Sequence, residues 1–159
     1  MQTIELQLYK FDELDQSAKD YAILEYRHHQ SEYYWIDDSI NSIKAFCNHF
    51  DIKIKDYSIS PYAHSYIDTD AENHHFRGMK LKDFDRDFMP TGYCVDCDLW
   101  VTFYDTLKQN GDLLGAFNAG INAGLRAIIA DMEYENSDEH IAEMLTINEY
   151  DFLESGKLY

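Results

Sequence analysis

Proline and cysteine are scarce in this sequence of 159 residues, which contains two prolines and three cysteines. Two prolines, 45% hydrophobic residues and the absence of any low-complexity tract argue against a disordered chain. An odd number of cysteines, two of them separated by only two residues, does not form the disulfide framework of a small secreted domain. We therefore expect a folded protein in a reducing compartment, the cytoplasm.

Several functional signals are missing as well. The N-terminal sequence MQTIELQLYKFDE has neither the basic start nor the apolar core of a signal peptide. No uninterrupted apolar run approaches the roughly 18 residues that span a bilayer. There is no Gly-x-Ser-x-Gly nucleophile elbow, no phosphate-binding loop and no dinucleotide-binding fingerprint. We expect no membrane contact, no cofactor and no enzymatic activity.

Basic residues are few: 13 Lys and Arg stand against 30 Asp and Glu, for a net charge of −17. Such a chain repels nucleic-acid phosphates and attracts basic protein surfaces, so direct nucleic-acid binding is disfavoured. No Lys or Arg occurs between Arg126 and Lys157. The charge serves either solubility alone or the imitation of nucleic-acid phosphates in the basic channel of another protein.

The acidic residues are clustered along the sequence. One cluster follows the longest apolar stretch, a second runs from Asp68 to Asp87, and a third consists of Asp96, Asp98 and Asp105. From the first two we predict a partner-binding surface. Its residues are Glu133, Glu135, Asp138, Glu139 and Glu143, supported by Asp83, Asp85 and Asp87.

The stretch 112–132 has the clearest periodicity. Apolar residues from Leu114 to Met132 recur at spacings of three and four, which predicts an α-helix. A second stripe holds only small residues, including Gly120 and Gly124. Because glycine inside a helix costs about 1 kcal/mol, this stripe predicts close packing against another element. It packs either inside the domain or across a homodimer interface.

Other segments complete a predicted α+β domain spanning residues 1–159, with a small antiparallel sheet packed against about five helices. We expect Asp15 to cap a helix to about His28, and Cys47 to be a buried thiol. We expect a bulge near Asp56 in the strand over 52–59. Further helices are predicted over 34–50, 95–111 and 137–145, strands over 3–9 and 62–69, and a closing strand or hairpin over 149–159.

Cys94 and Cys97 form a Cys-x-x-Cys pair, and His74 and His75 are possible further metal ligands. A zinc site needs four ligands, so this pair is half of one. A redox dithiol is the other chemical alternative, while a purely structural role is the simplest interpretation. We expect no bound metal and keep these four residues as weak candidates.

Both ends of the chain carry a recognisable pattern. It consists of Tyr9-x-Phe11-Asp12-Glu13-Leu14 with Ala18-Lys19 and Ala22, and of Ser137-Asp138-Glu139, Asn148-Glu149-Tyr150-x-Phe152 and Gly156-Lys157. Together these motifs resemble small acidic proteins of bacteriophages, prophages and plasmids that are often labelled antitoxin of a toxin–antitoxin stability system. Those relatives usually have Ser where this chain has Asp15. The resemblance implies no catalytic residues.

The resemblance implies a mobile genetic element in a bacterial host. In that context small acidic proteins frequently block host defence proteins. The hypothesis is a cytoplasmic anti-CRISPR or antirestriction inhibitor that binds a basic nucleic-acid-binding host protein through its acidic surface. One alternative is an antitoxin that neutralises a cognate toxin by packing an apolar groove. A second is a metal-binding protein that uses Cys94 and Cys97.

Overall fold

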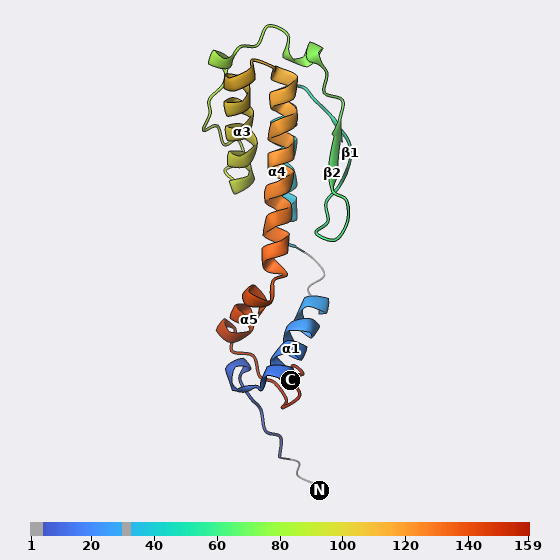
Figure 1. Cartoon of the computed structure of the whole chain (residues 1–159), viewed down its shortest axis with the longest axis vertical. Helices are drawn as coiled ribbons and strands as arrows, with labels where there is room; N and C mark the ends of the chain where they lie inside the picture. Colours follow the sequence, from blue (N-terminus) through green and yellow to red (C-terminus); the bar gives the residue numbers. More distant parts are fainter. Residues whose placement is uncertain (1–4, 30–32) are drawn as a thin grey trace. The chain divides into compact units, whose positions relative to one another are not determined.

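The computed structural model describes residues 5–29 and 33–159. Over these residues it has five α-helices and one two-stranded antiparallel sheet (Figure 1), which confirms the predicted α+β class. The chain divides into two compact units. We call residues 5–29, 33 and 133–159 the terminal unit, and residues 34–132 the central unit.

Three helices build the central unit: α2 (Ile36–His49), α3 (Cys94–Asn110) and α4 (Leu113–Glu135), of which α4 belongs to this unit up to Met132. The helices predicted over 34–50, 95–111 and 112–132 are thereby confirmed with small differences in their bounds. Gly111 ends α3 in the left-handed conformation, with φ of 69°. Its N–H donates to the Leu107 carbonyl at 2.8 Å, the αL cap expected of a glycine at this position.

The small-residue stripe of α4 packs against α3. A Cβ at Gly120 would lie 2.8 Å from the Leu99 carbonyl oxygen and 3.0 Å from Cζ of Phe46. At Gly124 it would lie 2.7 Å from a methyl carbon of Leu99. The two glycines therefore allow close approach inside the central unit, which is one of the two packings that the sequence left open.

Aromatic rings fill the space between α2, α3 and α4. Phe46 is fully buried, and its ring centroid lies 5.0 Å from that of Trp100 and 5.2 Å from that of Phe117. Phe50 and Phe103 join the same cluster at 5.2 Å from each other. Buried aromatic side chains remove about 150–250 Å² each from water, so this cluster dominates the stability of the central unit. Cys47 is buried beside it, as predicted.

Within the described residues, α4 alone has the length and hydropathy of a membrane-crossing helix, with 23 residues and a mean hydropathy of 1.3 over its most apolar window. A core helix passes the same test. Phe117 and Ile128 on α4 are fully buried, and Gly120 contacts the backbone of α3. We interpret α4 as a core helix.

The central unit also contains a β-hairpin, which is drawn next to α4 in the view of Figure 1. It consists of β1 (Ile54–Ser58) and β2 (Tyr66–Thr69). Ile54 pairs with Thr69 while Asp56 pairs with Asp68, so Lys55 is an extra residue and forms the bulge that the phase shift predicted. The connection to α3 contains two short 3-10 turns, Asn73–Phe76 and Leu81–Asp83.

The terminal unit contains α1 (Gln16–His29) and α5 (Asp138–Ile147), both as predicted apart from their exact ends. Asp15 caps α1, because its carboxylate accepts the Ala18 N–H at 2.8 Å. This hydrogen bond lowers the pKa of Asp15. Ser137 caps α5 by accepting the His140 N–H at 3.2 Å. Both caps provide a hydrogen-bond acceptor to a helix N-terminus that otherwise lacks one.

The strand predicted over residues 3–9 is wrong for its described part, residues 5–9; residues 3 and 4 lie outside the described residues. Only Tyr9 pairs, exchanging two backbone hydrogen bonds of 2.9 Å with Phe152. The tail turns at Gly156, where φ is 83°, and returns to pair Leu158 with Phe152. The C-terminal tail therefore pairs with one residue of the N-terminal segment and does not provide the edge of a sheet along which a whole strand could pair. Leu6 is consequently half exposed.

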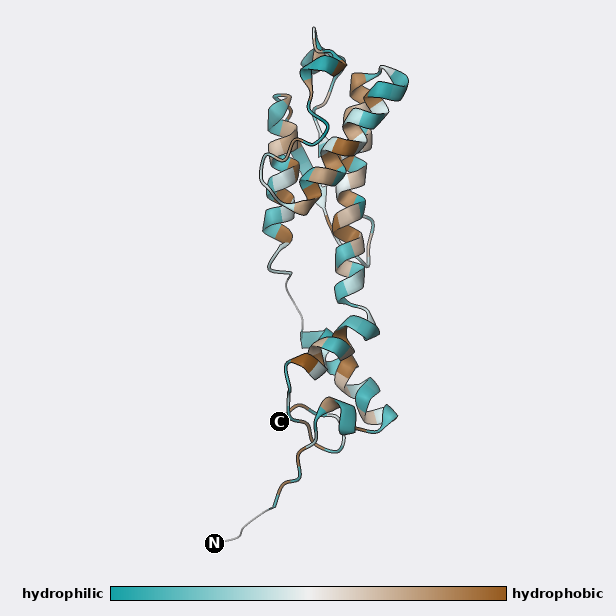
Figure 2. Cartoon of the chain, turned by 90° about the vertical axis from the view of Figure 1, so that its left-hand side faces the viewer, coloured by the Kyte–Doolittle hydropathy of each residue, from teal (hydrophilic) through white to brown (hydrophobic). Residues whose placement is uncertain are grey.

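Hydrophobic residues alternate with hydrophilic ones along the helices in Figure 2, as expected of amphipathic segments.

The two ends of the chain share one small core. The rings of Phe11 and Phe152 lie 6.1 Å apart, and Lys10 pairs with Asp151 at 2.8 Å. The buried cluster consists of Phe11, Leu14, Ala18, Ala22, Ile23, Ile141, Leu145 and Phe152.

Candidate functional site

The negative charge is concentrated in the terminal unit. The two segments that form it, 1–33 and 133–159, hold 15 Asp and Glu against 4 Lys and Arg in 60 residues, a net charge of −11. The other 99 residues carry the remaining −6. A surface of this density attracts basic proteins and repels nucleic acid.

Five of the predicted partner-binding residues lie in this unit, on the last turn of α4 and on α5. Glu133, Glu139 and Glu143 are exposed. Glu139 and Glu143 are four residues apart on α5, so their side chains share one face about 6 Å apart along the axis. We call these three residues the acidic face.

The other two predicted residues take part in internal interactions. Asp138 pairs with Arg27, whose Nε also donates to the Asn136 carbonyl at 3.0 Å. Arg27 thus ties the end of α1 to the segment between α4 and α5. Glu135 interacts electrostatically with Tyr26, whose pKa is raised mainly by burial. The terminal unit therefore uses Asp138 to hold its own helices together, which sequence reasoning did not foresee.

The second predicted group, Asp83, Asp85 and Asp87, lies in the central unit and has local partners. The Asp83 carboxylate accepts the Lys80 N–H at 2.8 Å, and Asp85 accepts the Asp87 N–H at 3.1 Å. Asp87 lies 3.5 Å from Arg86. These carboxylates shape their loop, and the structure places them in a different unit from the acidic face.

Two of the three residues in the third acidic cluster of the sequence, Asp96 and Asp105, have structural roles. Asp96 is fully buried, and its Oδ2 accepts from the Thr91 N–H and hydroxyl and from the Gly92 N–H at 2.8 to 3.0 Å. Asp105 accepts a bidentate pair of hydrogen bonds from Arg86, each 2.9 Å long, and this interaction lowers the pKa of Asp105. Burial raises the pKa of Asp98. Asp98 itself is exposed, whereas Asp96 and Asp105 are engaged in internal contacts.

An apolar pocket opens within the terminal unit, with a volume of about 310 Å³. Its apolar walls come from α1, α5 and the C-terminal tail, and Glu25, His29 and Lys157 supply its polar lining. The sequence did not predict it, because its lining combines α1 and α5 with the tail that folds back at Gly156. The local signal in the sequence was the spacing of Ala22 and Tyr26, which lie four residues apart and share one face of α1. The other lining residues are Ala22, Tyr26, Leu145, Tyr150, Phe152, Gly156 and Leu158.

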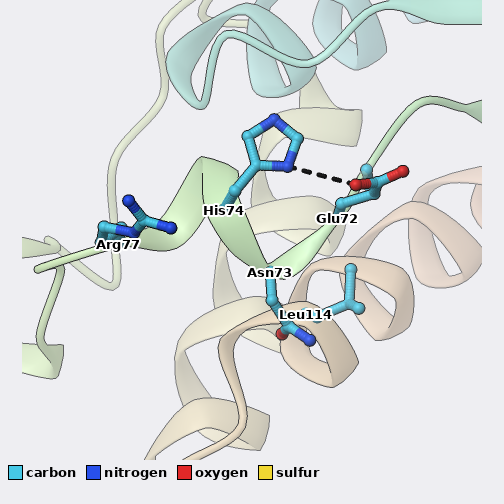
Figure 3. Close-up of a pocket in the computed structure, with 6 residues that line it drawn as sticks. Glu72, Asn73, His74, Arg77 and Leu114 are labelled. Atoms are coloured by element: carbon cyan, nitrogen blue, oxygen red, sulfur yellow. Dashed lines mark ion pairs between the residues drawn. The ribbon is translucent and has the colours of Figure 1, made fainter.

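A wider, polar pocket of about 610 Å³ lies in the central unit around the 3-10 turn 73–76. Figure 3 shows Glu72 and His74 paired on one side of it, with Nδ1 of His74 3.3 Å from the carboxylate, and Leu114 of α4 on the other. Arg77, which follows the turn directly, also lines the pocket. Besides His74, the ionisable residues that line the pocket are one carboxylate, Glu72, and one guanidinium, Arg77.

The candidate metal ligands are not assembled. Cys94 and Cys97 are exposed free thiols on the first turn of α3. The ring centroids of His74 and His75 lie 4.0 Å apart on the preceding loop, with the two rings tilted by 33°. Among residues 5–29 and 33–159, no group of three or more His, Cys, Asp or Glu side chains is placed to hold a metal ion.

Comparison with known proteins adds no relative to these observations. No family model matches the chain, and neither a curated protein nor a solved structure matches it.

Proposed function

We propose that this chain is an inhibitor from a mobile genetic element that binds a basic nucleic-acid-binding protein of the host, a CRISPR effector or a restriction enzyme, through the acidic face. The observation that supports this proposal is the net charge of −11 within the 60 residues of the two segments, 1–33 and 133–159, that form the terminal unit. The proposed partner is a protein; the chain acts without catalysis, and binds neither nucleic acid nor membrane.

The spacing on α5 suits the imitation of a nucleic acid. One strand of DNA carries a phosphate about every 3.4 Å along the axis, so two carboxylates about 6 Å apart stand for every second phosphate. Glu133 adds a third exposed carboxylate, in the last turn of α4. A basic channel that fits DNA phosphates would therefore also attract these side chains.

The test is inhibition of DNA cleavage by a panel of purified CRISPR effectors and restriction enzymes. The variant Glu133→Gln/Glu139→Gln/Glu143→Gln should inhibit less well. Exposed charge pairs contribute about 0.2–1 kcal/mol each, so three lost pairs weaken binding about 3- to 150-fold.

A matched control removes three charges elsewhere. Asp37, Asp38 and Asp51 are exposed in the central unit, and asparagine tolerates the positive φ of 56° at Asp51. The variant Asp37→Asn/Asp38→Asn/Asp51→Asn should inhibit like the original protein. If both triple variants lose the same amount of inhibition, the inhibition depends on overall charge and not on the acidic face. If the original protein inhibits none of the enzymes in the panel, the proposal is refuted.

The apolar pocket favours a second candidate, an antitoxin that binds a toxin by accepting one of its apolar side chains. Binding of this kind survives high salt, whereas binding through the acidic face weakens as salt rises. Tyr150 lines the pocket and remains partly exposed. With a purified toxin, Tyr150→Ala should reduce affinity at high salt, while the triple glutamine variant should bind normally.

A further inference from the structure

Two of the three cysteines are accessible as a pair. Cys94 is the first residue of α3 and Cys97 follows three residues later, and both are exposed free thiols. The third, Cys47, is buried, and burial raises its pKa to about 12. A reagent in solution therefore meets only the thiols of Cys94 and Cys97 in the folded protein.

Helix geometry brings this pair within reach of a disulfide bond. With a rise of 1.5 Å and a Cα radius of about 2.3 Å, residues three apart have Cα atoms about 5 Å apart. Disulfides span Cα distances of about 4.4–6.8 Å, although their Cβ atoms lie closer together than in a regular helix, by about 1–2 Å. The N–H of Cys94 belongs to the first turn, outside the intrahelical ladder, so this end of α3 can make the adjustment.

The loop that precedes Cys94 is held to α3 by hydrogen bonds to a buried side chain. Asp96 lies between the two cysteines in sequence, but its side chain is fully buried and accepts three hydrogen bonds from Thr91 and Gly92. The loop that leads into α3 is therefore fixed to the helix. Cys94 and Cys97 are held on the outside of the same turn, where bond formation does not disturb the aromatic core.

The surroundings favour oxidation over metal binding. Within the described residues no third His, Cys, Asp or Glu completes a metal site with the pair. Arg86, which Asp105 holds through two hydrogen bonds of 2.9 Å, interacts electrostatically with Cys97.

We propose that Cys94 and Cys97 form a reversible intramolecular disulfide by exchange with a small-molecule disulfide of the glutathione class. The thiolate of one cysteine attacks a sulfur of the small disulfide and releases one small thiol, leaving a mixed disulfide. The second thiolate attacks the protein sulfur and releases the other small thiol. Two protein thiols are oxidised and one disulfide is reduced, and in a reducing compartment such a bond acts as a redox sensor.

The experiment incubates the folded, full-length protein with oxidised glutathione, then labels remaining thiols with iodoacetamide before and after unfolding. The reduced protein should accept two labels when folded and a third after unfolding, at Cys47. The oxidised protein should accept none when folded and one after unfolding, with an intact mass lower by two hydrogen atoms. Reduced glutathione in excess should restore both labels.

Two single variants serve as controls. Cys94→Ser and Cys97→Ser should each stop at the mixed disulfide and gain the mass of one glutathione less two hydrogen atoms, while Cys47→Ala should oxidise like the original protein. Stable mixed disulfides in the original protein, disulfide-linked dimers, or folded-state labels that persist in oxidised glutathione would each overturn the proposal. So would a zinc-dependent dimer that protects the same two thiols, because it would assign the pair to a metal shared between copies.

Discussion

Replacing Gly156 by alanine tests whether the tail fold-back holds the terminal unit together. Gly156 has a φ of 83°, which non-glycine residues adopt at a cost of about 1–2 kcal/mol. Its backbone also lies against α1. A Cβ here would collide with the Ala18 carbonyl oxygen and lie 2.8 Å from the carbonyl carbon. Because these are backbone atoms they cannot rotate away, and overpacking of this kind costs about 1–3 kcal/mol more.

Gly111 provides a matched control. Its φ of 69° is similar, but nothing lies within 4 Å of an added Cβ. Gly111→Ala should therefore lose only the conformational part, about 1–2 kcal/mol, in the central unit. Gly156→Ala should lose about 2–5 kcal/mol in the terminal unit, and the difference between the two variants measures the close approach to Ala18.

Hydrogen exchange followed by mass spectrometry separates the two units. Peptides from α1 and α5 report on the terminal unit, while urea unfolding followed by the fluorescence of Trp35 and Trp100 reports on the central unit. The extra cost of about 1–3 kcal/mol corresponds to about 5- to 150-fold faster exchange in α1 and α5 of Gly156→Ala. If Gly156→Ala costs its unit no more than Gly111→Ala costs the central unit, the packing of the tail on Ala18 is refuted.

Two further predictions concern the central unit. Burial raises the pKa of Cys47 from 9.0 to about 12, so the folded state keeps a proton that the unfolded state releases. The contribution of the Cys47 thiol to the free energy of unfolding should be fully present below about pH 9 and should fall by about 1.4 kcal/mol per pH unit above it. Urea unfolding across this pH range should show the decrease. In Cys47→Ala this part of the decrease should be absent. Gly120→Ala should destabilise by about 1–3 kcal/mol despite the better helix propensity of alanine, because its Cβ meets the Leu99 carbonyl. Asn118→Ala, on the exposed side of α4, should stay within about 0.5 kcal/mol, and equal urea midpoints for both α4 variants would contradict the packing.

Helices were predictable from the sequence because their signals are local. The apolar period of α4, the cap at Asp15 and the glycine at position 111 each depend on residues within one or two turns. The bulge near Asp56 was predictable for the same reason, since a phase shift in a strand is visible along the chain. The prediction of a strand over residues 3–9 was wrong because an alternating pattern indicates a potential strand but not the strand with which it pairs. In the C-terminal tail only Phe152 pairs with this segment.

The candidate site was less predictable, because a carboxylate has the same appearance in the sequence whether it is free or engaged. Asp138 reaches Arg27 across 111 residues of chain, and Asp96 turns inward to hold Thr91. The apolar pocket was missed because its walls combine α1, α5 and the tail. Its formation depends on the contact at Gly156, which no periodicity reveals.

The charge of the terminal unit has a consequence for how it binds. A net charge of −11 surrounds a buried cluster of only eight residues, so mutual repulsion opposes a small core. A basic partner would remove that repulsion at the moment of binding, and any ligand that prefers the folded state also stabilises it. If the acids served solubility alone, they could be spread evenly over both units. Their concentration where the core is smallest is costly without a partner and favourable with one, which supports the proposed inhibitor role over a purely solubilising one.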